Sequence, residues 1–176
     1  MKHRLIAGVI NRYQPEEGWV NLHMDISPRP IWIGSLEFAG LPDVIGDIAN
    51  MVDFRDEMFD EVRLHHVLEH LDRVSANSAL RETLRVLKPG GNLDIEVPDM
   101  LRVVNAWLAD ELDDAGFQQW TYGEQLAHHE PGDSHRYGWT ETALRAELRA
   151  EGFQVGDREE TGLALRFIAT KPAVEE

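Results

Sequence analysis

Three histidines and a glutamate, His65, His66, Glu69 and His70, fall within one six-residue stretch of the chain. Imidazole titrates near neutral pH, so a histidine here can take a proton from a substrate hydroxyl or orient the substrate. If these residues open a helix, His66 pairs with His70, and His65 with Glu69, each one turn apart. We therefore predict His66 and Glu69 as catalytic residues. The alternative is that both side chains only hydrogen-bond a neighbouring loop and hold the junction together.

The same stretch spells His-x-x-Glu-His, the signature of inverted zinc peptidases, in which two histidines bind zinc and the glutamate activates water. Such peptidases need a long helix around the motif and a distant third ligand, whereas here the motif follows a predicted strand. We therefore assign no metal ligand. A different metal site, and with it a His-ligated metal hydrolase, stays an alternative because more histidines follow at His128, His129 and His135.

The elements that must position these residues alternate between strand and helix. Short apolar or alternating runs predict strands at 4–9, 19–26, 43–47, 60–64, 92–97, 153–157 and 163–170. Apolar residues at helical spacing predict helices at 78–87, at 100–112, and from an N-cap at Thr140 to Gly152. This order is typical of an α/β fold with a mainly parallel sheet and an antiparallel edge strand.

Residues 1–176 are expected to form one domain, since the length suits a single hydrophobic core and no linker or repeat interrupts the chain. Within it, residues 113–135 are polar and aromatic without a clear period. We interpret that segment as a lid or an insertion.

Three ordered blocks in the middle of the chain resemble class I S-adenosylmethionine-dependent methyltransferases, in particular a compact methyltransferase-11-like subgroup. The blocks are Phe59–Leu71, Leu84–Leu93 with its Arg-Val-Leu-Lys-Pro-Gly-Gly run, and Val97–Asp99. The resemblance implies a Rossmann-like fold. It also implies a transferase that moves a methyl group from S-adenosylmethionine to a small-molecule or sugar-like acceptor.

The resemblance further implies which residues meet the cofactor. Gly8 falls in the turn that approaches the methionine part, Asp25 lies near the place of the acid that holds the ribose, and Asp47 stands at the adenine-binding position. His65, at the end of the following strand, is assigned to the same site. The alternative for Asp47 is that it only caps residues 48–51.

On the acceptor side, His135 and Tyr137 precede the last helix, as they do in the subgroup, and are predicted to bind the substrate. One departure weakens the cofactor prediction. The second glycine of the family's first turn is replaced by Ile10, whose branched side chain resists positive φ and close backbone approach. A methyltransferase-fold protein that binds or interacts without catalysis is therefore the second hypothesis.

The amino-acid composition limits the kinds of molecule with which the protein is expected to interact. The formal charge of -15 repels polyphosphate backbones, and the 17 Lys and Arg residues form no basic run, so a nucleic-acid substrate is not expected. No apolar stretch is long enough for a membrane helix, and the sequence holds no cysteine. We expect a cytoplasmic protein that acts on a small molecule away from membranes. Its oligomeric state stays open.

Overall fold

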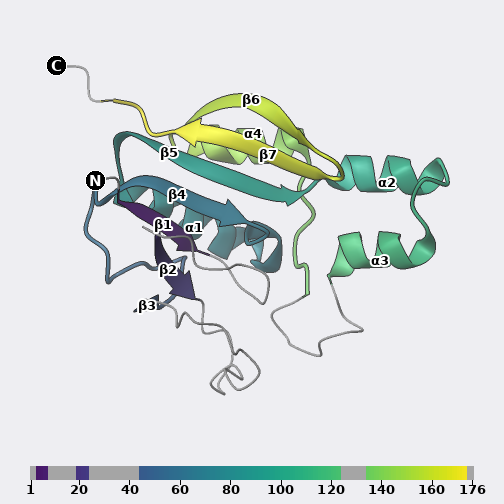
Figure 1. Cartoon of the computed structure of the whole chain (residues 1–176), viewed down its shortest axis with the longest axis horizontal. Coiled ribbons are helices and arrows are strands. Elements are labelled where there is room, and N and C mark those ends of the chain that lie inside the picture. The colour runs from purple at the N-terminus through teal and green to yellow at the C-terminus, as the bar shows by residue number, and fades with distance from the viewer. Residues whose placement is uncertain (1–2, 8–18, 24–43, 124–133, 174–176) are drawn as a thin grey trace.

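A computed structural model of the chain describes residues 3–7, 19–23, 44–123 and 134–173. A seven-stranded sheet in the order β3-β2-β1-β4-β5-β7-β6 runs through these residues (Figure 1). The strands are β1 (Arg4–Ala7), β2 (Trp19–His23), β3 (Val44–Ile45), β4 (Phe59–His65), β5 (Leu87–Pro98), β6 (Gln154–Thr161) and β7 (Ala164–Thr170). All seven strands lie where the sequence patterns predict them.

The strands from β3 to β5 pair in parallel, whereas β7 runs antiparallel to both β5 and β6. This confirms the predicted Rossmann-like α/β class with its largely parallel sheet. The antiparallel strand lies one place inside the edge, because β6 pairs on its outer side.

Four α-helices and one short 3-10 helix accompany the described strands. They are η2 (Leu68–His70), α1 (Arg73–Val86), α2 (Met100–Leu108), α3 (Asp114–Tyr122) and α4 (Glu141–Ala150). Each α-helix begins after a residue whose side chain accepts a backbone N–H of the first turn, and Thr140 does so for α4 as predicted. Helix α3 was not predicted. It buries no residue fully, so its sequence carries no apolar stripe.

The core lies between the sheet and helices α1 and α4, which sit side by side on one face of it (Figure 1). Side-chain contacts of Arg73 and Asn77 with Glu147 join the two helices, as do the Arg81 contacts with Glu151. Fully buried leucines such as Leu80 and Leu144 each stabilise the fold by roughly 2 kcal/mol. This packing fixes the orientation of β4 and β5.

The start of β5 is irregular. The sequence pattern predicts the strand only from residue 92, but the strand already begins at Leu87 and its register against β4 is irregular there. Phe59 pairs with Leu87, while Glu61 pairs with Asn92. Gly90 has a φ of 77°, a conformation that favours glycine.

The carboxyl ends of β4 and β5 point toward helices α2 and α3 (Figure 1). None of the helices in the described part of the chain is both long and apolar enough to cross a membrane. The cytoplasmic location, the extent of the domain and the lid role of residues 113–135 stay predictions.

Candidate functional site

The histidine cluster lies where β4 ends, on the end of that strand and a short 3-10 helix rather than on one α-helix. His65 is the last residue of β4, His66 has a φ of 54°, and η2 covers only residues 68–70. Helix α1 begins at Arg73. The predicted one-turn pairs, His66 with His70 and His65 with Glu69, are therefore wrong, because helical spacing does not apply across a strand end and a left-handed residue. The long helix that the zinc-peptidase signature requires is likewise not formed at these residues.

His66 lies between two carboxylates. Its Nδ1 is 3.1 Å from Oε1 of Glu69, and its Nε2 is 3.0 Å from Oε1 of Glu96 on the neighbouring strand. Hydrogen bonds to Glu69 and then to Glu96 raise the pKa of His66 to about 10, although burial opposes this. The bond from His66 correspondingly lowers the pKa of Glu96. At neutral pH the His66 ring is thus an imidazolium, which donates hydrogen bonds and accepts no proton.

His65 is engaged with a different carboxylate. Its Nε2 lies 2.8 Å from Oδ1 of Asp94, a residue of β5 that is 2% exposed. Arg166 on β7 donates to both oxygens of Asp94, at 2.8 and 2.9 Å. Burial opposes ionisation of Asp94, yet the bonds from His65 and Arg166 hold its pKa well below the usual range. This network fixes the His65 ring on the sheet, and contact of His65 with a cofactor stays a prediction.

Asp94 and Glu96 are the site residues that the sequence prediction missed. Both are carboxylates two residues apart in an otherwise largely buried strand, and both are paired with histidines at the end of the adjacent strand. Charged residues are rarely buried without a partner. Two carboxylates in an otherwise largely apolar strand were therefore the feature of the sequence that could have identified Asp94 and Glu96 as site residues.

Glu69, the other predicted catalytic residue, is 1% exposed, and its backbone oxygen accepts the amides of Arg136 and Tyr137 at 2.7 and 3.2 Å. These bonds bring the segment before α4 to η2. The rings of His70 and His135 then meet edge to face, with centroids 4.9 Å apart. Burial lowers the pKa of His135. The structure therefore brings the predicted substrate-binding segment against the histidine cluster.

Aromatic side chains lie on two segments near this cluster, α3 and the residues before α4. Trp120 on α3 lies near His66, with ring centroids 6.4 Å apart. Tyr137 is partly buried and packs edge to face on Trp139, which is 1% exposed. Tyr137 thus helps to cover the core, and the Trp120 ring is the aromatic surface beside His66.

At the cofactor side, Asp47 follows β3 and is exposed. Its Oδ1 accepts the backbone N–H of Ala49 at 2.8 Å, and its backbone oxygen accepts that of Asn50 at 2.9 Å. Asp47 therefore does cap the residues that follow it, which is the alternative role predicted for it. Gly8 and Asp25 lie outside the described residues, as do Ile10, His128 and His129.

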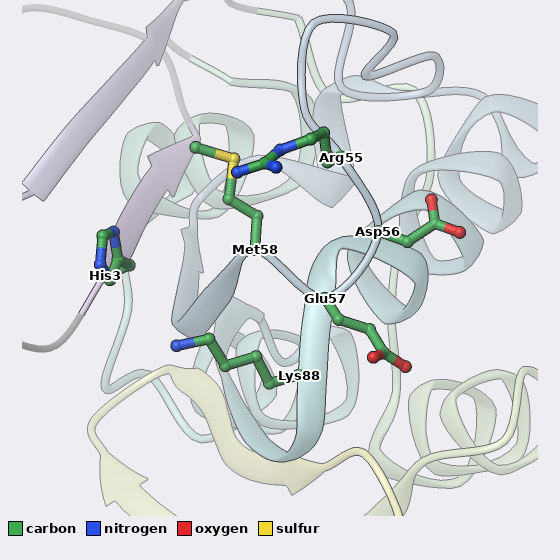
Figure 2. Close-up of a pocket in the computed structure, with 6 residues that line it drawn as sticks. All are labelled: His3, Arg55, Asp56, Glu57, Met58 and Lys88. Atoms are coloured by element: carbon green, nitrogen blue, oxygen red, sulfur yellow. The ribbon is translucent and has the colours of Figure 1, made fainter.

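A pocket of about 350 Å³ lies at the opposite end of the sheet, near the start of β1, β4 and β5 (Figure 2). It is lined by His3, Arg55, Asp56, Glu57, Met58 and Lys88. Ligands of open α/β sheets bind beyond the carboxyl ends of the strands, so this pocket is on the wrong side for that chemistry. It holds none of the predicted site residues.

Relatives and solved structures point to one family. Demethylmenaquinone methyltransferase of Leptospira interrogans is 31% identical over 116 residues, which cover 62% of this chain and 45% of that protein. The chain thus spans less than half the length of this curated relative.

Among solved structures, a S-adenosylmethionine-dependent methyltransferase of Methanosarcina mazei matches with a TM-score of 0.61 and 17% identity, covering 98% of this chain and 93% of that one. A Burkholderia thailandensis 1,6-didemethyltoxoflavin-N1-methyltransferase, solved with 1,6-didemethyltoxoflavin and S-adenosylhomocysteine, matches with a TM-score of 0.56 and 19% identity. It covers 97% of this chain and 71% of that one. At these identities the likeness concerns the fold.

The family model for the methyltransferase domain matches residues 7–95, which is half of the chain and spans β2, β3, β4 and most of β5. The resemblance of the central sequence blocks is thereby confirmed, and the chain belongs to the class I methyltransferase family.

Proposed function

We propose that this chain is an S-adenosylmethionine-dependent methyltransferase acting on a small-molecule or sugar-like acceptor. The observation that carries the proposal is the methyltransferase-domain match to residues 7–95, within which β4 ends at the histidine cluster. The Leptospira and Burkholderia relatives are named for small-molecule acceptors, which supports the acceptor class. The formal charge of -15 argues against a nucleic-acid acceptor.

For the cofactor, the carboxylate acceptor that follows β3 fits the adenine amine, which is a hydrogen-bond donor. The exposed carboxylate of Asp47 uses Oδ1 for Ala49, and Oδ2 has no hydrogen-bond partner among the described residues, so it can accept from an exocyclic N–H. Asp25 would hold the ribose hydroxyls, and Gly8 would let the backbone approach the methionine part. When bound, S-adenosylmethionine supplies an electrophilic methyl group.

At the acceptor, the residues of this chain position the substrate and do not deprotonate it. The His66 imidazolium, between Glu69 and Glu96, can donate a hydrogen bond to an acceptor oxygen once it leaves one of its carboxylates. Trp120 offers a ring face beside it. His135 and Tyr137 lie on the segment joined to Glu69 and would border the same acceptor. Of the two roles predicted for His66, orientation of the substrate is the one that suits its protonated form.

Isothermal titration of the full chain with S-adenosylmethionine and with S-adenosylhomocysteine tests the proposal. We expect saturable heat with one cofactor per chain, and S-adenosylhomocysteine formation when hydroxylated small molecules are added. Absence of heat at millimolar cofactor contradicts the proposal. Cofactor binding without turnover on any acceptor of a broad panel favours the non-catalytic binding protein that Ile10 suggests.

A further inference from the structure

Glu69 carries a buried oxygen that the methyltransferase proposal does not use. The residue is 1% exposed, and its Oε1 contacts His66. Its Oε2 is buried and has no hydrogen-bond partner among the described residues. A buried carboxylate oxygen without a partner is costly, and native proteins pair such atoms with donors or with cations. The position of Glu69 therefore calls for a further positive or donor group.

Two imidazoles lie beside this carboxylate. Glu69, His70 and His135 each offer one ligand atom, and these atoms all lie within 4.8 Å of one another. The Nδ1 atom of His70 is also buried without a partner among the described residues. Glu69 and His70, which are consecutive residues of this group, thus each carry a buried polar atom without a partner among the described residues.

The remaining histidine is held in a form that can bind a cation. His135 Nδ1 lies 3.1 Å from the backbone oxygen of Trp120. A carbonyl oxygen only accepts, so Nδ1 carries the hydrogen and Nε2 keeps its lone pair. Metal-binding histidines commonly use this arrangement, in which a backbone carbonyl fixes the ring and its tautomer.

The backbone also holds the three residues together. Glu69 accepts the amides of Arg136 and Tyr137, at 2.7 and 3.2 Å, and the His135 amide donates to the Tyr122 oxygen at 3.1 Å. The ligand-bearing segments are therefore tied to each other independently of any ion. A site whose segments are already positioned loses less entropy on binding.

We propose that Glu69, His70 and His135 bind one divalent transition-metal ion, with Zn²⁺ as the reference ion. Two imidazoles and one carboxylate form a ligand set that Zn²⁺ and Fe²⁺ both accept. Bonds of about 2.1 Å around a tetrahedral ion put ligand atoms about 3.4 Å apart, so each pair of ligand atoms must approach by at most about 1.4 Å, through movement of the two partly buried histidine rings. Three protein ligands leave a position for water or for an oxygen of a bound molecule.

This site goes beyond methyl transfer and does not rest on it. It also differs from the zinc-peptidase pattern in the sequence, since His135 takes the place that the motif gives to His66. His66 instead contacts the opposite oxygen of Glu69 and orients that carboxylate.

The test is a Zn²⁺ titration of the full chain after removal of metals with a chelator, followed by calorimetry. We expect one ion per chain, and Co²⁺ in its place should give visible absorption bands typical of nitrogen and oxygen coordination. His135→Ala should weaken Zn²⁺ binding by more than about tenfold. His3→Ala is the matched control, because His3 is exposed at the other end of the sheet and the chain has 8 histidines that can bind ions weakly.

Equal affinity of His135→Ala and the native chain overturns the proposal, as does an equal loss in His3→Ala. Circular dichroism in chelator reports whether each variant folds. If His135→Ala does not fold, the Co²⁺ spectrum of the native chain decides alone, and a spectrum of the fully hydrated ion rejects the site. Cofactor titration of the chelated chain separates this outcome from failure of the methyltransferase proposal.

Discussion

The Nε2 atom of His66, at the carboxyl end of β4, lies 3.0 Å from Oε1 of Glu96 on β5. The backbone joins the same two residues, since the His66 amide donates to the Glu96 oxygen at 2.9 Å. With Glu69 on the other side of the ring, the site stabilises an imidazolium. Electrostatics at this strand end thus favours a cation where the sequence alone suggests a neutral base.

His66 should titrate far above the ordinary range for histidine. NMR titration of the chelator-treated chain is expected to give a pKa near the value of about 10 that follows from its two carboxylate partners. Glu96→Gln should lower the pKa toward 6.5, yet not fully, because Glu69 remains. Glu61→Gln, on β4 away from the cluster, is the control and should leave it unchanged. A native pKa near 6.5 contradicts the geometry.

Asp94→Asn should destabilise the fold by about 2 kcal/mol at neutral pH, because Arg166 and His65 lose a charged acceptor. The pKa of Asp94 is lowered in the folded state, so its contribution is present above about pH 3.8 and is lost as the pH falls further. Urea unfolding at several pH values measures both effects.

The control for that change is Glu159→Gln, which removes a carboxylate that is 47% exposed and 3.3 Å from Arg166. It should cost less than about 0.5 kcal/mol. Equal losses in the two variants would mean that the buried pairing at Asp94 carries no special weight.

Asp47→Asn separates the two roles of Asp47. An asparagine keeps an oxygen for the Ala49 amide but replaces the second oxygen with a donor. We expect the unfolding temperature without cofactor to stay unchanged, and the affinity for S-adenosylmethionine to fall by about tenfold or more. Asp47→Ala should lower both the unfolding temperature and the affinity for S-adenosylmethionine. Unchanged affinity in Asp47→Asn leaves only the capping role.

Thr140→Ala should destabilise the chain by about 1 kcal/mol, because Thr140 Oγ1 accepts the Ala143 amide at 3.3 Å at the start of α4. Thr142→Ala changes an exposed threonine inside the same helix and serves as the matched control. Thermal unfolding distinguishes them. Thr142→Ala should leave stability unchanged or raise it slightly, because alanine has the higher helix propensity. A loss of the same size in Thr142→Ala would show that the cap at Thr140 makes no special contribution.

Local pattern in the sequence was sufficient for the fold class and most elements. Apolar runs and caps such as Thr140 act over a few residues, so they can be recognised without tertiary structure. The central blocks around Phe59–Leu71 and Leu84–Leu93 likewise indicated the methyltransferase family. Helix α3 escaped prediction because it buries no residue fully and thus shows no apolar stripe.

The chemistry of the cluster depended on contacts that only the fold creates. His65 and His66 find Asp94 and Glu96 some thirty residues away, because the register of β4 against β5 sets those partners. The left-handed backbone at His66 removes the helical spacing on which the sequence prediction relied. The sequence by itself therefore determined that the histidines and Glu69 gather at one strand end. Tertiary structure decided which carboxylates meet them and in which charge state, because those contacts depend on strand register.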